Sequence, residues 1–267
     1  PGAAAADGYA IYLENLSKNY HDSEVVAVAW TNGSEIFTGD ASLLQADLFK
    51  SWLSDEQVTK VVFDAKRTKV MLDYVGIDFA GVVDDVLLGS YLLHARDNSN
   101  DLAEVAREFD MDDLSYDESI YGKGAKRGVP EEAEIMYEHI ARKVHIIARL
   151  QVTIRPQLEA NQMDDLYQKM ELPLALVLAN LEILGISVDK QQLVTMQAEF
   201  QEIIDGLEAN IWKEAGHEFN VNSPKQLGVI LFEEMGLPVI KKTKTGYSTA
   251  QDVLEKLAGQ APIIDLI

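Results

Sequence analysis

The chain has 267 residues, enough for one large domain or two smaller ones, and its composition is that of an ordinary globular protein. A formal net charge of −21 argues against a general nucleic-acid binder, because such a protein is expected to carry a basic surface. The absence of cysteine excludes disulfides and thiolate metal sites, and no apolar run approaches the roughly 18–20 residues of a membrane-spanning helix.

The pattern of residues 1–160 predicts a β-sheet formed mainly by the first strands of the chain, with helices packed over it, which is an α/β arrangement. The first seven residues lack a starting Met and have the composition of a linker or of a cut within a longer chain. Acidic residues 110–118 and basic residues 121–128 are predicted to form loops. The predicted strands are 9–16, 25–31, 34–38 and 60–63, and the predicted helices are 43–53, 66–75, 82–96, 101–109 and 131–158.

After residue 160 the pattern becomes almost entirely helical. A helix is predicted over residues 166–184, with Pro173 at a kink or a restart. A short extended link follows, and Asp189 is placed to cap a helix that runs to about Ala215. We therefore expect a domain of residues 1–160 and a second domain of residues 161–267, divided near residues 158–165.

The stretch from Asn220 to Thr249 contains two helix starts with a basic loop between them. Ser223 is placed to cap the first helix, Pro224 suits its first turn, and Gln226 completes a capping box. Ser248 or Thr249 is expected to start the second helix.

Between these helices lies the basic loop of residues 241–246, with the sequence Lys-Lys-Thr-Lys-Thr-Gly. Ammonium groups and backbone N–H donors between two capped helices suit a phosphate backbone. A short lysine cluster of this kind is more often a solvated loop, so charge alone leaves both interpretations open.

The order and spacing of residues 220–249 closely resemble the thumb of bacterial DNA polymerase I, a family A polymerase. The matching segments read Asn-Ser-Pro-Lys-Gln-Leu, Leu-Phe-Glu, and Leu-Pro-Val-Ile-Lys-Lys-Thr-Lys-Thr-Gly-Tyr-Ser-Thr. The likeness is strongest to the large fragment of the Bacillus-type enzymes. It covers nearly the whole chain and is stronger after residue 170.

This resemblance implies a thumb that grips primer–template duplex without reading its sequence. The implied contacts are Asn220, Asn222, Lys244 and Ser248, with long-range attraction from Lys241, Lys242 and Lys225. Turn and capping roles are the alternative for the two asparagines.

The same resemblance implies that residues 1–160 have a ribonuclease-H-like 3′–5′ exonuclease fold. Active members of the family hold two divalent metals on four carboxylates, found in the motifs Asp-x-Glu, Asn-x-x-x-Asp and Tyr-x-x-x-Asp. The corresponding positions here are Tyr12, Glu14, Thr68 and Lys143, so one acid of four remains. We expect a vestigial domain without a catalytic residue or a metal site.

Simpler structural roles are also open for these residues. Glu14 would then be a solvated or paired strand residue, Arg142 and Lys143 would lie on an exposed helix face, and the acids of residues 110–114 would form a solvated loop. One rival hypothesis is an active exonuclease with a rearranged metal site, for which Asp64 and Asp85 are the candidate carboxylates. Another is a DNA-binding module without a catalytic parent.

The leading hypothesis is an N-terminal piece of a DNA polymerase I large fragment, made of a vestigial exonuclease domain and part of the thumb. The palm carboxylates that bind Mg²⁺ for nucleotidyl transfer match no segment here, so this chain alone is expected to be inactive. The full-length parent would use Mg²⁺ and act in DNA replication and repair. Expected partners are primer–template duplex and the remaining palm and fingers, with no membrane, for a monomeric, cytoplasmic, nucleoid-associated bacterial protein.

Overall fold

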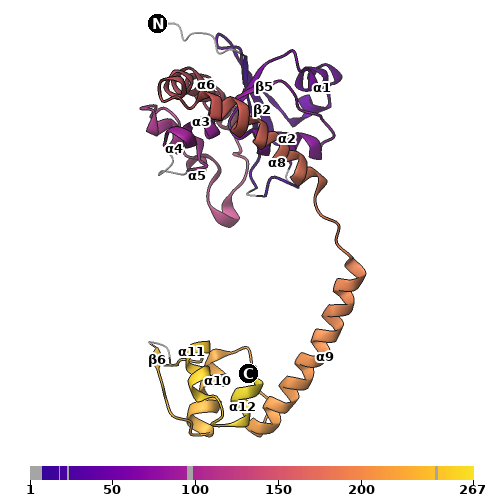
Figure 1. The fold of residues 1–267 in the computed structure, drawn as a ribbon, viewed down its shortest axis with the longest axis vertical. Helices are drawn as coiled ribbons and strands as arrows, with labels where there is room; N and C mark the ends of the chain where they lie inside the picture. Colours follow the sequence, from indigo (N-terminus) through magenta and orange to yellow (C-terminus); the bar gives the residue numbers. More distant parts are fainter. Residues whose placement is uncertain (1–7, 18, 23, 95–98, 244–245) are drawn as a thin grey trace. The chain divides into compact units, whose positions relative to one another are not determined.

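The computed structural model describes residues 8–17, 19–22, 24–94, 99–243 and 246–267. The chain forms two compact units, one that ends at Gly185 and one that begins at Ile186 (Figure 1). Helix α8 (Leu172–Leu184) packs on helix α2 (Ala65–Tyr74) and so belongs to the first unit. The domain division expected at residue 160 stays a prediction.

A five-stranded mixed sheet with the order β3-β2-β1-β4-β5 forms the centre of the first unit. Strands β1, β2 and β3 pair antiparallel, whereas β1, β4 and β5 pair parallel. The strands are β1 (Tyr9–Glu14), β2 (Ala27–Thr31), β3 (Ile36–Asp40), β4 (Lys60–Val62) and β5 (Val82–Asp85).

Strand β5 corrects the prediction of one helix over residues 82–96. Helix α3 (Val86–Leu93) begins only after Asp85, whose carboxylate accepts a hydrogen bond from the backbone N–H of Leu87 at 3.0 Å. A short apolar run fits a buried strand and a buried helix equally well, and pairing with β4 decides between them here.

Helices cover both faces of this sheet (Figure 1). Helix α6 packs against β1, β2 and α3, and its core also takes in residues of α4 and α5. The other face is covered by α1 and α2. The helices of this unit, besides α2, α3 and α8, are α1 (Asp47–Ser54), α4 (Leu102–Glu108), α5 (Asp117–Tyr121), α6 (Ala133–Ala160) and α7 (Asp164–Leu166), with shorter turns at η1 (Ala41–Gln45), η2 (Gly124–Lys126) and η3 (Tyr167–Glu171).

The two-residue period of strand β1 decides which of its side chains face α6. Ala10 and Tyr12 belong to the core on the α6 side, whereas Ile11 and Leu13 belong to the core on the α2 side. Successive side chains of a strand point to opposite faces, so Glu14 shares the face of Tyr12. The strand therefore places a phenol and a carboxylate two residues apart beneath α6.

A buried tyrosine joins the turn η3 to the sheet. The Tyr167 hydroxyl donates to a carboxylate oxygen of Asp84 and accepts from the backbone N–H of Asp85 at 2.7 Å. Gln151 of α6 donates to the other Asp84 oxygen at 3.0 Å. Burial raises the pKa of the Asp84 carboxyl and of the Tyr167 hydroxyl.

A second attachment lies on α8 itself, where Glu182 accepts hydrogen bonds from three side chains of the first unit. Tyr20 donates at 2.8 Å, the ring nitrogen of His21 lies at 2.9 Å, and Lys66 forms an ion pair with the other oxygen. Residues far apart in sequence thus fix α8 on the exonuclease-like fold.

The second unit begins with the long helix α9 (Lys190–Ala215). Asp189 caps it as predicted, since its carboxylate accepts from the backbone N–H of Gln192 at 3.0 Å. A separate core joins Ile211 to the elements that follow. These elements are α10 (Pro224–Val229), η4 (Ile230–Glu234), β6 (Lys242–Thr243), β7 (Gly246–Tyr247), α11 (Gln251–Leu254), η5 (Glu255–Leu257) and α12 (Pro262–Leu266).

Within the described residues, no helix combines the length and the apolar character that crossing a membrane requires. The exonuclease-like α/β fold followed by a mostly helical region agrees with the fold class expected from the sequence.

We predict that Tyr167→Phe lowers the free energy of unfolding by about 2–3 kcal/mol, because the buried Asp85 N–H loses its acceptor and Asp84 loses a donor. Urea unfolding followed by circular dichroism measures the effect. Tyr74→Phe is the matched control, since Tyr74 is 56% exposed, and should change stability by less than about 0.5 kcal/mol. Equal effects of the two substitutions would contradict the proposed role of the Tyr167 hydroxyl.

Candidate functional site

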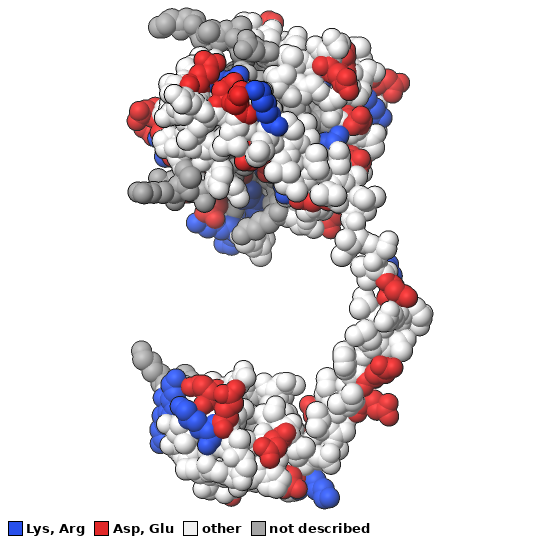
Figure 2. All heavy atoms as spheres, viewed as in Figure 1, with Lys and Arg blue, Asp and Glu red and all other residues white. Residues whose placement is uncertain are grey.

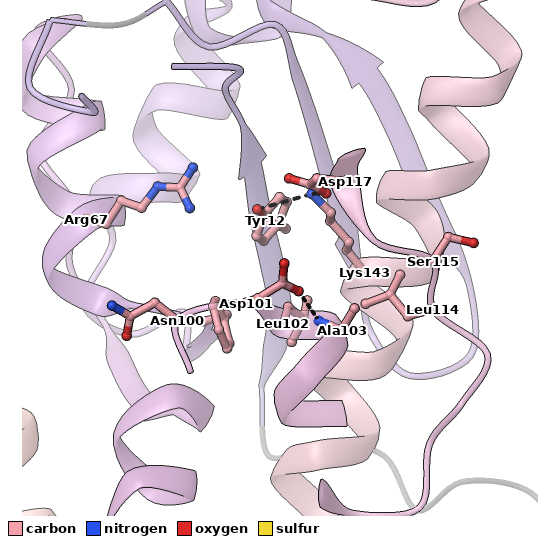
Figure 3. A pocket seen from close by; sticks show the side chains of 11 residues that line it. Tyr12, Arg67, Asn100, Asp101, Leu102, Ala103, Leu114, Ser115, Asp117 and Lys143 are labelled. Carbon is pink, nitrogen blue, oxygen red and sulfur yellow. Dashed lines mark hydrogen bonds and ion pairs between the residues drawn. The ribbon is translucent and has the colours of Figure 1, made fainter. Parts of the chain in front are cut away.

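Strand β1 and helix α6 bring three of the four predicted exonuclease positions together. Tyr12 and Glu14 lie on β1, Lys143 lies on α6, and all three are buried. Lys143 therefore corrects the expectation of an exposed helix face, which holds only for its neighbour Arg142. Figure 3 shows Lys143 reaching toward Tyr12 and Asp117.

The Lys143 ammonium is the centre of this group. It lies 2.6 Å from Glu14 Oε2, 2.7 Å from Asp117 Oδ1 and 3.3 Å from the Tyr12 hydroxyl. The rings of Tyr12 and Tyr121 face it with centroids at 4.7 and 5.8 Å. Burial alone would lower the Lys143 pKa, but Tyr12, Glu14 and Asp117 together hold that pKa well above its usual range.

Asp117 is the functional residue that sequence reasoning missed. It begins helix α5, within a segment that we expected to be a solvated acidic loop. Its Oδ1 also lies 2.9 Å from His139 Nε2, and its Oδ2 lies 3.4 Å from Arg127. Burial would raise its pKa, but the contacts with His139 and Lys143 hold the pKa well below its usual range.

Tyr121, at the end of the same short helix, closes the site over Glu14. Its hydroxyl donates to Glu14 Oε2 at 2.9 Å, the oxygen that also binds Lys143. The other oxygen, Oε1, is buried and has no hydrogen-bond partner among the described residues. Glu14 is thus a paired strand residue, as the simpler interpretation expected, with one oxygen left over.

The fourth predicted position, Thr68, forms a hydrogen bond with the backbone of its own helix. Its hydroxyl donates to the backbone carbonyl of Asp64 at 2.8 Å, inside the first turn of α2. Asp64 caps that helix through the N–H of Arg67 at 2.9 Å, and Asp85 accepts backbone N–H groups of residues 64, 65 and 87. Asp64 and Asp85, the candidate carboxylates for a rearranged site, therefore accept backbone N–H groups where α2 and α3 begin. The carboxylate that lies beside Glu14 is that of Asp117.

The four predicted positions do not fit a pair of divalent cations, which need several oxygen anions as ligands. They supply only one carboxylate, that of Glu14, beside the Tyr12 phenol, the Thr68 hydroxyl and the Lys143 ammonium. Repulsion between Lys143 and a metal ion in this buried place adds to the misfit. A neighbouring cavity of about 60 Å³, lined by Arg67, Asn100 and Ser115 among others, is far smaller than the roughly 300–1,000 Å³ of ordinary ligand pockets (Figure 3).

The turn before α10 holds the predicted thumb residues Asn220 and Asn222. Asn220 Oδ1 accepts from the N–H of Asn222 at 3.0 Å, so its amide oxygen serves the turn. Ser223 caps α10 through the N–H of Gln226 at 3.4 Å, as predicted. The capping box is different from the expected one, because Gln226 accepts from the N–H of Asn220 instead of that of Ser223.

The predicted basic loop is part of a short antiparallel hairpin formed by β6 and β7. Lys241 and Lys242 are exposed, and the Lys242 ammonium lies 5.3 Å from the ring centre of Tyr247. Lys244 lies outside the described residues. Figure 2 shows Lys and Arg atoms gathered at one end of this unit, directly beside acidic atoms.

Ser248 corrects a prediction, since it starts no helix. Helix α11 begins three residues later, and its N-cap residue is Ala250, without a side-chain hydrogen bond. Ser248 is only 7% exposed and its N–H donates to the carbonyl of Lys241 at 3.1 Å. This backbone bond joins the residues that flank β6 and β7, so Ser248 extends the hairpin by one pair.

Comparison with known families agrees with both units. Residues 11–150, slightly more than half of the chain, match the family described as DNA polymerase I, ribonuclease H-like domain. The chain belongs to the DNA polymerase I family. Residues 190–267 also match DNA polymerase family A.

Similar proteins extend well beyond this chain. It is 43% identical over 263 residues to DNA polymerase I of Geobacillus stearothermophilus and 42% identical over 260 residues to that of Bacillus subtilis. These matches cover 98% and 97% of the chain but only 30% and 29% of the relatives. A solved structure, the POL domain of Pol1 from M. smegmatis in complex with DNA primer-template and dNTP, has a TM-score of 0.70 and 25% identity, covering 98% of this chain and 44% of the other.

We predict that Asp117→Asn lowers the free energy of unfolding at pH 7 by about 2–3 kcal/mol, because Lys143 keeps only one carboxylate partner. The pKa of Asp117 is depressed on folding, so its stabilisation is present above the unfolded pKa and is lost as the pH falls toward the folded one. The difference between the two proteins should therefore shrink as unfolding is measured at pH values falling below about 4.

Asp113→Asn provides the matched control, since Asp113 pairs with Arg149 at 3.2 Å but is 52% exposed. Its effect should stay below about 1 kcal/mol at every pH. If Asp113→Asn and Asp117→Asn gave the same pH profile, Asp117 would not be the buried partner of Lys143.

Proposed function

We propose that the chain is the N-terminal part of the large fragment of a DNA-directed DNA polymerase I that acts in DNA replication and repair. Membership of the DNA polymerase I family and the matches of both units support this function. The chain spans about 30% of the length of these relatives, and nucleotidyl transfer with Mg²⁺ would be performed by parts of the longer protein.

In this proposal the exonuclease-like unit is a scaffold that has lost its chemistry. The observation that carries it is the ion pair of Lys143 with Glu14 at 2.6 Å, in the place where the family resemblance puts metal-binding carboxylates. An ammonium can neither activate water as a metal does nor share its ligands with a second cation.

The test is a 3′–5′ degradation assay of this chain on a 5′-labelled single strand with Mg²⁺ or Mn²⁺. We expect no shortening above the background of a Glu14→Ala variant, whose carboxylate is absent. Metal-dependent shortening that Glu14→Ala abolishes would contradict the proposal and favour the rival hypothesis of a rearranged site.

The second unit is proposed to be part of a thumb that contacts primer–template duplex through its backbone. Exposed Lys241 and Lys242 on the β6–β7 hairpin supply positive charge, while Asn220 and Asn222 supply amide donors at the start of α10. Lys244 stays a proposed contact by resemblance. Ser248 is 7% exposed, so a phosphate contact there, proposed by resemblance, requires a local rearrangement that exposes its hydroxyl.

The remainder of the polymerase is the proposed partner of apolar side chains that are exposed on α8 of the first unit and, separately, on α9 of the second. Leu181 of α8 and Phe200 of α9 are 57% and 56% exposed, and other apolar side chains of both helices are similarly open. A globular chain rarely leaves so many large apolar residues in water, so further polypeptide would cover them. A monomeric, cytoplasmic, nucleoid-associated parent stays part of this proposal.

We predict that Lys241→Ala/Lys242→Ala weakens duplex binding about equally for all sequences. Each lost phosphate contact should reduce the slope of log affinity against log salt by about 0.9. Fluorescence anisotropy with a labelled primer–template at several salt concentrations measures this slope.

Lys190→Ala/Lys213→Ala is the control, since both lysines lie on α9 of the same unit and the variant loses the same charge. Its slope should remain that of the unmodified chain. Equal losses in both variants would mean that net charge, and not the hairpin, is responsible for binding.

A further inference from the structure

The predicted exonuclease positions do not fit a pair of metal ions, but a different set of potential ligands surrounds Lys143. Carboxylates of Glu14 and Asp117 and the imidazole of His139 lie with their ligand atoms within 4.8 Å of one another. Only Glu14 belongs to the acids of the family motifs. We propose that Lys143 is an internal substitute for a divalent cation, and that its removal opens a new single-cation site on Glu14, Asp117 and His139.

The contacts of the ammonium resemble those of a bound cation. It touches one oxygen of each carboxylate, at 2.6 and 2.7 Å, and lies against two aromatic rings. The buried Glu14 Oε1 has no hydrogen-bond partner among the described residues, so this carboxylate has an unused ligand oxygen. The three N–H donors of the ammonium are matched by Glu14 Oε2, Asp117 Oδ1 and the Tyr12 hydroxyl, which leaves Oε1 unsatisfied, whereas a metal ion can bind both oxygens of one carboxylate.

The ligands are held in place by groups other than Lys143. Tyr121 donates to Glu14 at 2.9 Å, and Arg127 lies 3.4 Å from the second oxygen of Asp117. Arg127 is itself anchored by donating to the carbonyl of Leu16 at 2.8 Å. Shortening the side chain at position 143 should therefore leave both carboxylates near their present positions.

The ligand types favour zinc over magnesium. The imidazole nitrogen is the discriminating ligand, because Zn²⁺ binds imidazole and carboxylate groups at about 2.0–2.2 Å, whereas Mg²⁺ prefers an octahedral shell of oxygens. Tetrahedral bonds of that length place ligand atoms about 3.4 Å apart. The pair Asp117 Oδ1 and His139 Nε2, now 2.9 Å apart, would therefore separate slightly, while any wider pair of the cluster, at most 4.8 Å apart, would approach. His139 would bind through Nε2 as the tautomer that carries its proton on Nδ1.

Charge also favours the exchange. Removal of Lys143 leaves the buried Glu14 carboxylate and the 29% exposed Asp117 carboxylate without the ammonium they share, and a divalent ion would restore positive charge between them. The inference goes beyond the proposed function, because cation binding is independent of nuclease activity and of DNA binding.

The experiment is titration of Lys143→Met, in the complete 267-residue chain, with ZnCl₂ by calorimetry and by thermal unfolding. We expect one equivalent of Zn²⁺ to bind and Tm to rise with its concentration, with no comparable effect of MgCl₂. The unmodified chain should bind no equivalent at this site, because the ammonium occupies it.

Two variants separate this site from the surface histidines. Glu14→Gln/Lys143→Met removes a ligand and should weaken Zn²⁺ binding by about tenfold or more. Lys66→Met is the matched control, since Lys66 also pairs with a glutamate beside a histidine and a tyrosine, but has only one carboxylate. It should gain no Zn²⁺ binding.

A Lys143→Met chain that folds only when Zn²⁺ is present would support the proposal as strongly as a rise in Tm. Lys143→Gln, whose amide can donate to Glu14, provides a second variant for calorimetry. Absence of Glu14-dependent Zn²⁺ binding in both variants would overturn the proposal, and so would a Glu14-dependent equivalent bound by the unmodified chain.

Discussion

The first unit depends on one buried cation. Lys143 is 3% exposed and contacts both Glu14 and Asp117, which come from different parts of the chain. Burying a charge is costly, and the ion pair of Lys143 with Glu14 offsets that cost, while the 29% exposed Asp117 gives the ammonium a second carboxylate. Strand β1, helix α5 and helix α6 are therefore tied together through one ammonium group.

Part of this site can be predicted from the sequence. The two-residue period of a strand puts Tyr12 and Glu14 on one face, and the family resemblance puts Lys143 beside them, whereas the residues alone suggested an exposed helix face for Lys143. Asp117 and Tyr121 could not be found this way, because no local pattern indicates that a five-residue helix among acidic residues turns its side chains inward. Tyr121 is positioned by its contact with Glu14, 107 residues earlier in the chain. Asp117 is positioned by its contact with His139, 22 residues later.

The fold shows the same division between local and distant causes. The start of α9 at Asp189 and of α10 at Ser223 was predictable, because one side chain and the next backbone N–H groups determine a cap. Strand β5 was wrongly predicted as part of a helix, because its four residues become a strand only by pairing with β4, and the local sequence does not show that pairing. Ser248 was predicted to cap a helix, but its N–H pairs with the carbonyl of Lys241 across the hairpin, a partner seven residues away that no local cap pattern indicates.

Electrostatics explain why Asp117 and Lys143 belong together. A lysine beside Glu14 alone would have a single partner, and a second carboxylate beside Glu14 alone would repel it in a medium of low dielectric constant. Either change by itself raises the free energy of the folded chain, whereas the two together form a paired cluster. Helix α5 is held against this cluster by Asp117 and Tyr121, so the second ion pair of Lys143 and the closure of the site over Glu14 depend on the same short helix.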